Sequence, residues 1–457
     1  MTKTARTTGA LIAAMCLPLA LTACGGGGGF SDSGSGASGS SSALPTPTDK
    51  PVNLLIGSSG DAETKAVNAA VAAWSKESGI PAKVQVAADL PQEAAQGFAA
   101  GTPADIVYTA TDVFAAWVKA GNLTPYADQL DNKDDYYDGL KQAFTSDGQF
   151  YCAPKDFSTL QLVINDKLWK EAGLTEAGHP KTWEELATVS KKLTKGKVKG
   201  LAFGPEVQRV GVFLAQNGGG LETDGKATAN SEANVEALTW VKQAMTDGWA
   251  AYSSDLGAGW GGEAFGKEQA AMVIEGNWIT GTMTNDYADV EYTVVELPEG
   301  KNKGTLQYTN CWGVTAKGDN VGGAVDLVKY LTATEQQLAF AKAFGVMPSL
   351  KSAKQQWSTD NPEMVPFING ADYAQNLPAE VGAQDVIKDM NAQLSQLRTK
   401  EPQAILDQVQ GNLEAIVAGW PPTTTEGCRC PHPSVAPDGG LPTSRPSPGG
   451  SSSSPSW

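Results

Sequence analysis

Apolar and polar positions change period repeatedly along the middle of the chain. Short apolar or alternating runs predict strands at residues 52–57, 83–86 and 104–108. Apolar residues at helical spacing predict helices at residues 67–74 and 113–120. This order predicts an α/β fold, with mostly parallel sheet and helices on both faces. In such sheets ligands bind beyond the carboxyl ends of the strands, so the loops at residues 58–59 and 109–112 are placed to contact one.

Helix start signals recur further along the chain. Thr182 and Glu185 form a capping box in which each side chain can satisfy a backbone donor, and Thr334 with Gln337 repeats the pattern. Apolar residues at helical spacing predict a final amphipathic helix over residues 405–417.

The first 24 residues have the pattern of a secretion signal. Lys3 and Arg6 precede an apolar stretch at residues 10–21, which is too short to span a bilayer comfortably. The letters LTAC at residues 21–24 have the pattern of a bacterial lipobox, so residues 1–23 are predicted to be a lipoprotein signal peptide and Cys24 to carry lipid. The Gly-, Ser- and Pro-rich residues 24–50 are predicted to be a flexible tether.

Charge and cysteine usage fit the same compartment. The 457 residues carry a formal net charge of −16, which argues against binding to nucleic acid or to an anionic membrane surface. Once Cys16 has left with the signal peptide and Cys24 is lipidated, Cys152 and Cys311 remain in the folded region. They are expected to form a disulfide in an oxidising environment.

The composition changes abruptly near the C-terminus. Residues 421–457 are rich in Pro and Ser and nearly free of aliphatic side chains, which predicts disorder. Two interpretations stay open: a natural flexible tail, or sequence translated out of frame in place of a final helix.

Five segments, in order, resemble the family-1 extracellular solute-binding proteins, the maltose-binding-protein-like sugar receptors of ABC importers. They are ADIV at residues 104–107, AGNLTP at 120–125, YCAP with LVINDKLW at 151–169, PKTWEEL at 180–186 and AMVIEGNW at 271–278. Each is weak alone, but their order behind a lipobox favours this family over residues 51–418.

The resemblance implies a type II periplasmic-binding-protein fold, with two lobes joined by crossing segments and a sugar held between them. Lobe 1 is expected to comprise residues 51–157 and 309–345, and lobe 2 residues 158–308 and 346–420. Crossing segments near residues 153–160, 306–312 and 345–350 would place Cys152 and Cys311 on neighbouring hinge strands. The implied protein is a monomer with no cofactor, anchored by lipid to the outer face of the cell membrane. Its implied partners are a sugar and the permease and ATPase of the importer.

Sugar sites combine aromatic platforms with planar polar side chains. The resemblance makes Trp278 the first candidate platform, with Trp312 and Trp260 as further ones; for Trp312, hinge packing is an equal alternative. Candidate polar contacts are Asn277, Glu275, Asp156, Asp112, Gln216, Asp61 and Ser58. For Asp112 and Asp156 simple solvation is the alternative, and Asp61 can instead cap a helix.

Two rival functions are weighed against sugar transport. A secreted glycosidase would need paired carboxylates such as Glu263 and Glu275, but no segment resembles a catalytic loop. The same fold could bind another solute, such as a polyamine at an acidic, aromatic site. A metal ligand is not expected, because clustered His and carboxylate residues are absent from the sequence.

Overall fold

A computed structural model describes residues 44–223 and 225–417. Its strands are β1 (Val52–Ile56), β2 (Ala82–Val86), β3 (Ile106–Ala110), β4 (Thr145–Ser146), β5 (Gln149–Phe150), β6 (Pro154–Asn165), β7 (Leu201–Phe203), β8 (Glu222–Thr223), β9 (Lys226–Ala227), β10 (Ala250–Tyr252), β11 (Met272–Gly276), β12 (Tyr292–Val295), β13 (Thr305–Val314) and β14 (Ala374–Gln375). The short pairs β4–β5 and β8–β9 are hairpins outside the main sheet.

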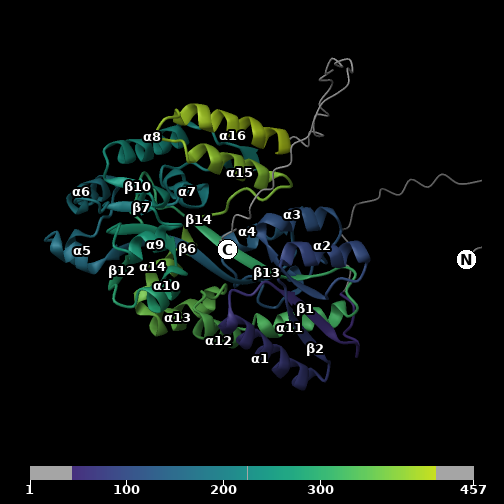
Figure 1. Ribbon diagram of the computed structural model, residues 1–457. Helices are drawn as coiled ribbons and strands as arrows, with labels where there is room; N and C mark the ends of the chain where they lie inside the picture. Colours follow the sequence, from purple (N-terminus) through teal and green to yellow (C-terminus); the bar gives the residue numbers. More distant parts are fainter. Residues whose placement is uncertain (1–43, 224, 418–457) are drawn as a thin grey trace, which may run out of the picture. The chain divides into compact units, whose positions relative to one another are not determined.

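Helices surround the sheet on both sides (Figure 1). They are α1 (Asp61–Ser78), α2 (Leu90–Ala100), α3 (Thr111–Lys119), α4 (Asp138–Ala143), α5 (Asp166–Glu171), α6 (Trp183–Leu193), α7 (Val207–Gln216), α8 (Glu232–Thr246), α9 (Gly261–Gly266), α10 (Ile279–Asp286), α11 (Val321–Leu331), α12 (Thr334–Phe344), α13 (Lys354–Asp360), α14 (Val365–Asn369), α15 (Ala383–Leu394) and α16 (Pro402–Val417).

The main sheet runs in the order β10-β7-β11-β6-β13-β3-β1-β2, with β12 also pairing β6 and β14 pairing β13. The outer pairs β1–β2, β1–β3, β7–β10 and β7–β11 are parallel, as the strand–helix–strand pattern predicts. At the centre, β13 pairs antiparallel with both β6 and β3. The two longest strands, β6 and β13, therefore connect the two parallel halves of the sheet.

Two of the three clusters of buried apolar residues lie at the two ends of this sheet. One core takes residues from β1, β3, α1 and α11, and the other takes residues from β7, α7, α8 and α16. Strand β13 contributes to both, since Leu306 is in the second core and Trp312 is in the first. The crossing residues 345–350 also lie against β6, where Phe157 N donates to Met347 O over 3.2 Å.

Most element predictions match, with local differences. β3 begins two residues later than expected and extends to Ala110, and the final helix is α16. Thr182 caps α6 by accepting from Glu185 N at 3.2 Å, but the Glu185 carboxylate accepts from Lys181 N rather than from Thr182. The capping box at Thr334 is wrong, because Thr334 is already the first residue of α12 and makes no cap bond.

The end of the expected tether is ordered against α11. Asn320, which caps α11, donates to the carbonyls of Thr48 and Lys50 at 3.0 and 2.7 Å. The predicted signal peptide, the lipidation site Cys24 and the tail at residues 421–457 lie outside the described residues. Within residues 44–223 and 225–417, no helix has the length and apolar character that a membrane span requires.

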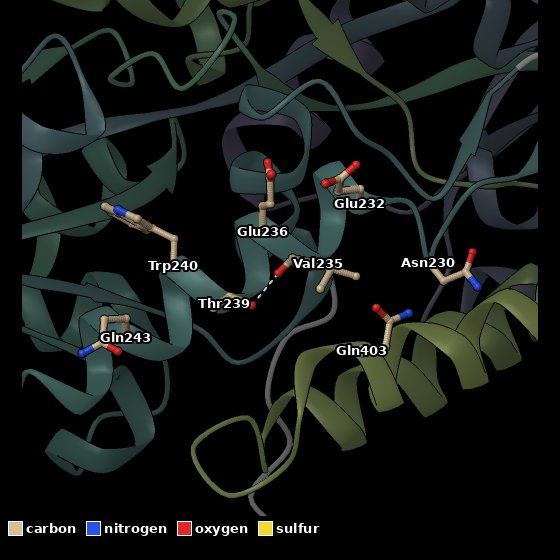
Figure 2. A pocket seen from close by; sticks show the side chains of 8 residues that line it. All are labelled: Asn230, Glu232, Val235, Glu236, Thr239, Trp240, Gln243 and Gln403. Atoms are coloured by element: carbon tan, nitrogen blue, oxygen red, sulfur yellow. Dashed lines mark hydrogen bonds between the residues drawn. The ribbon is translucent and has the colours of Figure 1, made fainter.

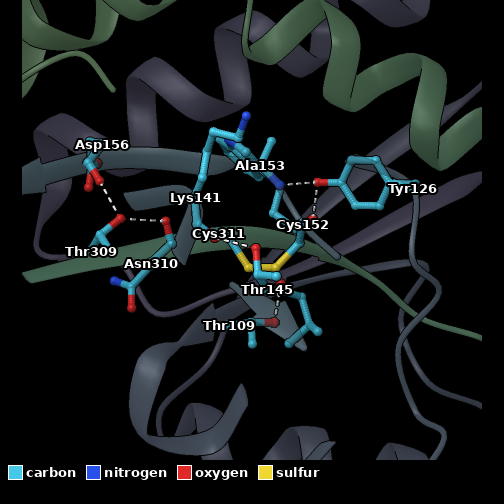
Figure 3. The surroundings of a disulfide bond; sticks show 12 residues. Thr109, Tyr126, Lys141, Thr145, Cys152, Ala153, Asp156, Thr309, Asn310 and Cys311 are labelled. Carbon is cyan, nitrogen blue, oxygen red and sulfur yellow. Dashed lines mark hydrogen bonds between the residues drawn. A yellow bond between two sulfur atoms is a disulfide. The ribbon is translucent and has the colours of Figure 1, made fainter. Parts of the chain in front are cut away.

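The expected disulfide joins Cys152, just before β6, to Cys311 in β13 (Figure 3). Tyr126 reinforces the same junction, because its hydroxyl accepts from Ala153 N at 2.9 Å and donates to Trp312 O at 2.6 Å. The covalent bond and this hydroxyl thus hold the start of β6 against β13.

A carboxyl pair beside the β8–β9 hairpin predicts a pH effect on stability. Burial and the nearby Glu380 raise the pKa of Glu222 to about 7. The folded state therefore binds the proton of the Glu222 carboxyl more tightly than the unfolded state does. This difference adds to the free energy of unfolding fully below pH 4.5, and the gain is lost as the pH rises through about 7. We expect Glu222→Gln, which keeps a neutral donor, to raise the melting temperature more at pH 8 than at pH 5. Equal effects at both pH values would contradict this assignment.

Candidate functional site

Four half-buried side chains share one face of the two central strands: Asp156 and Ser158 on β6, and Tyr308 and Asn310 on β13. Tyr308 pairs with Ser158, and Asn310 pairs with Asp156. Directly paired residues in an antiparallel ladder point to the same side, and positions two apart lie about 7 Å from each other. We call this group the polar face of β6 and β13.

The opposite side of both strands is covered. There Phe157 is buried against Tyr137, and Thr159 donates to Phe367 O of α14 at 2.6 Å. Along the side that carries the polar face, Trp312 is buried near Phe340 of α12, and Leu306 lies in the core beside Gly211 of α7. The polar face is therefore the stretch of β6 and β13 between the cover of α12 and the cover of α7.

A buried charge cluster flanks the polar face on the side of α1. Lys155 contacts both the Asp156 carboxylate and Glu63, the latter at 3.0 Å, and its ammonium lies 4.8 Å from the ring centre of Tyr108. Tyr108 donates to Glu63 at 3.0 Å. Burial alone would lower the pKa of Lys155, but the two carboxylates raise it above the ordinary value, so the amine stays charged.

A second cluster flanks the polar face on the side of α7. Arg209 donates through Nε and Nη2 to one oxygen of Glu275, at 3.1 and 2.8 Å. Trp278 Nε1 donates to the same oxygen at 3.1 Å, and the Arg209 guanidinium lies 5.2 Å from its ring centre. Burial raises the pKa of Glu275, and the Arg209 charge opposes this rise. These bonds fix the indole of Trp278.

The ring of Trp278 reaches the polar face through Tyr308. Their ring centres are 5.8 Å apart at an interplanar angle of 72°, and the Tyr308 hydroxyl donates to Gln208 O at 2.6 Å. Trp278 is half-buried, so part of its surface remains accessible. An accessible indole beside hydroxyl, amide and carboxylate groups can contact both the apolar and the polar sides of a polyhydroxylated molecule.

Gly276 makes the position of Trp278 possible, because a Cβ at residue 276 would lie 2.3 Å from the indole. We expect Gly276→Ala to displace the ring and to lower stability by about 1–3 kcal/mol. The matched control is Gly281→Ala in α10, where an added Cβ meets nothing within 4 Å. Thermal melts of both variants check this, and an unchanged melting temperature for Gly276→Ala would contradict it.

The structure brings three of the predicted residues together at this place. Asp156 belongs to the polar face, and Trp278 borders it. The buried Glu275 accepts hydrogen bonds from both Trp278 and Arg209. Glu275 is only 1% exposed, so its role is to position these neighbours rather than to meet a ligand directly.

Three other predicted residues are buried and interact only with other parts of the protein. Trp312 is 1% exposed and packs edge-on against Tyr108, so it is a core residue and not an accessible platform. Gln216 is buried and bonded to Trp183 and Gly304. Asn277 is buried and donates to Gly345 O at 3.1 Å, which ties it to the crossing segment at residues 345–350.

The remaining predicted residues keep some exposure but have no contact with the polar face among the bonds described. Trp260 is half-buried over Gly262. Ser58 bonds to Gly60 O and accepts from Thr64, which arranges the turn before α1. Asp61 and Asp112 are exposed in the first turns of α1 and α3.

Sequence reasoning missed most of the residues that build the site: Glu63, Lys155, Ser158, Arg209, Tyr308 and Asn310, together with Glu206, whose carboxylate lies 3.9 Å from Arg209 Nη1. The alternation of polar and apolar residues along 156–158 was a usable signal, because it marks a strand face that is not fully buried, whereas residues 308–310 show no such alternation. Nothing in the sequence, however, pairs Arg209 with Glu275.

Glu263 and Glu275, the carboxylates considered as a glycosidase pair, lie in different surroundings from each other. Glu263 on α9 contacts Lys267, which follows the helix, whereas Glu275 is buried against Arg209. Within the described part of the chain, no group of three or more His, Cys, Asp or Glu side chains is arranged to hold a metal ion.

A separate surface groove of about 660 Å³ lies between α8 and the start of α16 (Figure 2). Trp240, Gln243 and Gln403 are among its walls. It shares no residue with the polar face or with the two charged clusters.

Comparison with known proteins identifies similar chains. A family model described as bacterial extracellular solute-binding protein matches residues 69–366. Among curated proteins, the sn-glycerol-3-phosphate-binding periplasmic protein UgpB of Agrobacterium fabrum is 24% identical over 260 residues. That match covers 52% of this chain and 59% of the relative, so the chain spans less than two thirds of that relative's length.

Solved structures resemble this chain over a larger share of its length. The cyclic alpha-maltosyl-1,6-maltose binding protein from Arthrobacter globiformis has a TM-score of 0.72 at 20% identity, covering 81% of this chain and 99% of that one. UgpB from Mycobacterium tuberculosis, in complex with glycerophosphocholine, has a TM-score of 0.67 at 19% identity, with 81% and 98% covered. At these identities the likeness shows the fold alone, and it confirms the predicted type II periplasmic-binding-protein fold.

Proposed function

Since this chain belongs to the bacterial extracellular solute-binding protein family, we propose that it is the substrate-binding component of an ABC importer and binds a carbohydrate. The ligand class is a di- or oligosaccharide. The Arthrobacter relative, whose name gives a cyclic maltosyl sugar as its ligand, supports this choice. The role is capture and delivery, without chemical conversion of the sugar.

The observation that carries the proposal is the half-buried but accessible Trp278 beside the polar face. A sugar ring has C–H faces that stack on an indole and hydroxyls that bond to planar polar groups. Asp156 and Asn310 supply such groups from paired positions on neighbouring strands. Tyr308 adds a second ring at 5.8 Å from Trp278.

We propose that the lobes divide at β6 and β13, with residues 51–157 and 309–345 in lobe 1 and residues 158–308 and 346–420 in lobe 2. Two separate cores on either side of these strands support this division, while a third cluster combines residues of both proposed lobes, such as Leu140 and Phe265. A sugar held between the lobes would stabilise a closed form that the hinge already reaches, and the closed form would dock on the permease. Small-angle scattering with and without sugar tests this, since an unchanged radius of gyration would contradict closure.

The proposed setting is the outer face of the cell membrane. The lipoprotein signal at residues 1–23 supports lipid attachment at Cys24, which would tether a monomer near its permease and ATPase. Cell fractionation tests the anchor: the protein should sediment with membranes, and Cys24→Ala should release it. If the wild-type protein is also found in the soluble fraction rather than with the membranes, the lipid anchor is ruled out.

A phosphorylated solute is the second candidate ligand. The names of two relatives, which mention sn-glycerol 3-phosphate and glycerophosphocholine, favour it. A polyamine is a further alternative, because carboxylates and aromatic rings lie together at the polar face.

A thermal-shift panel separates these ligand classes, because a tight ligand raises the melting temperature by mass action whatever its site. The panel comprises mono- and oligosaccharides, sn-glycerol 3-phosphate, glycerophosphocholine and spermidine. We expect a shift with at least one sugar and no product after prolonged incubation. A shift with phosphorylated probes alone, or conversion of the sugar, would overturn the proposal.

A further inference from the structure

Each cation beside the polar face is shared by two carboxylates. Lys155 lies between Glu63 and Asp156, and Arg209 lies between Glu275, at 2.8 Å, and Glu206, at 3.9 Å. Together the two clusters hold four carboxyl groups and two cations, and burial raises the pKa of Asp156 and of Glu275. In each cluster one carboxylate is buried in the protein (Glu63 or Glu275), which we call inward, and the other is partly accessible to solvent (Asp156 or Glu206), which we call outward.

The inward carboxylates, those of Glu63 and Glu275, are buried and accept hydrogen bonds from groups inside the protein. The side chains of Glu63 and Glu275 are 3% and 1% exposed. Glu63 also accepts from Ser59 N and from Tyr108, while Glu275 also accepts from Trp278. Their bonds fix the positions of Lys155 and Arg209.

The outward carboxylates keep accessible surface. The side chain of Asp156 is 13% exposed and that of Glu206 is 33% exposed. A carboxylate accepts several hydrogen bonds, so each retains acceptor capacity beyond its contact with the shared cation. Hydroxyl and ammonium groups are donors that can use this capacity, whereas a carboxylate or phosphate on the ligand has nothing to donate when ionised.

Carboxylates occupy the starts of α1 and α7, the two helices that carry the clusters; α10, which begins after Trp278, has no acidic residue in its first turn. The N-terminus of a helix ordinarily favours anions. Here Glu206 itself occupies the N-cap of α7, and Asp61 and Glu63 lie in the first turn of α1. An incoming anion would therefore meet carboxylates at both helix starts.

We infer that the polar face accepts uncharged or amino-bearing sugars and rejects sugars that carry a carboxylate or phosphate, with Asp156 and Glu206 as the discriminating residues. This inference rests on the proposed function and narrows its ligand class. It also assigns a role to Glu206, which the sequence motifs do not mark.

Isothermal titration at low ionic strength tests the inference. The probes are glucose, glucosamine and glucuronate; galactose, galactosamine and galacturonate; and maltotriose and sn-glycerol 3-phosphate. We expect the probes that bind to be neutral or amino-bearing, with each matched uronate at least about tenfold weaker. A uronate that binds as tightly as its neutral counterpart would overturn the inference but leave sugar binding intact. Binding of sn-glycerol 3-phosphate alone would overturn both.

Variants identify the residues responsible. Glu206→Gln and Asp156→Asn should each reduce the preference for the neutral probe over the uronate. Glu184→Gln is the matched control, because Glu184 is an exposed carboxylate in the first turn of α6, away from the polar face. If both Glu206→Gln and Asp156→Asn keep the wild-type preference for the neutral probe over the uronate, these two residues are not the discriminating ones.

A measurement without sugar covers the case in which no probe binds. The fluorescence of Trp278, isolated by difference from Trp278→Phe, can be quenched by caesium or by iodide. We expect caesium to quench it at least about twofold more strongly than iodide, because the local potential is negative. Glu206→Gln should narrow this difference, and stronger quenching by iodide would overturn the inference.

Discussion

Replacing Trp278 by alanine is expected to weaken binding of the best sugar at least about 30-fold, or roughly 2 kcal/mol. The indole is the half-buried but accessible ring held by Glu275 and Arg209 beside the polar face. Its removal takes away the larger of the two aromatic surfaces beside the polar groups and leaves only the ring of Tyr308. Isothermal titration of the variant against the sugar that gives the largest thermal shift measures the loss.

Two further variants separate ring stacking from folding. Trp278→Phe keeps an aromatic ring but loses the bond to Glu275, so it should bind with intermediate affinity. Trp240→Ala changes an indole of the α8–α16 groove and should leave sugar affinity unchanged, whatever it does to the melting temperature. If Trp278→Ala binds like the wild-type protein, Trp278 is not part of the site.

Removing the Cys152–Cys311 disulfide is expected to lower the free energy of unfolding by about 3–5 kcal/mol. The two cysteines are 159 residues apart, so the bond closes a long loop and restricts the unfolded chain strongly. The double variant Cys152→Ala/Cys311→Ala should melt roughly 5 °C below the wild-type protein in oxidising buffer. Sugar affinity should remain within a few fold, since neither cysteine is among the four residues of the polar face.

Reduction provides the internal control for this prediction. Reduced wild-type protein should melt near the double variant, and the double variant should not respond to reductant. Peptide maps under non-reducing conditions should recover the Cys152–Cys311 pair. Two free thiols in those maps, or equal melting temperatures with and without reductant, would contradict the prediction.

The fold was largely predictable because its signals are local. Periodicity located β1, β2 and α1, and the spacing of apolar residues located α16. The capping prediction at Thr334 failed because the chain enters α12 one residue earlier, at Ala333. Such boundaries depend on neighbours in space as well as on the sequence motif.

The site was only partly predictable because it depends on register and on contacts far apart in the chain. Arg209 and Glu275 are 66 residues apart, and only the folded chain makes them partners. The burial of Trp312 shows the same limit. Tyr308 and Trp312 lie on the same strand, yet only Trp312 is covered by the first core. Strand alternation gives the face of a side chain, but not which helix covers it.

A crystal structure with the best sugar of the thermal-shift panel tests most directly whether a sugar binds at the polar face of β6 and β13. We expect a sugar ring against Trp278, with hydroxyls bonded to Asp156 and Asn310. A sugar bound at the α8–α16 groove, or anywhere without contact to Trp278 and the polar face, would contradict it.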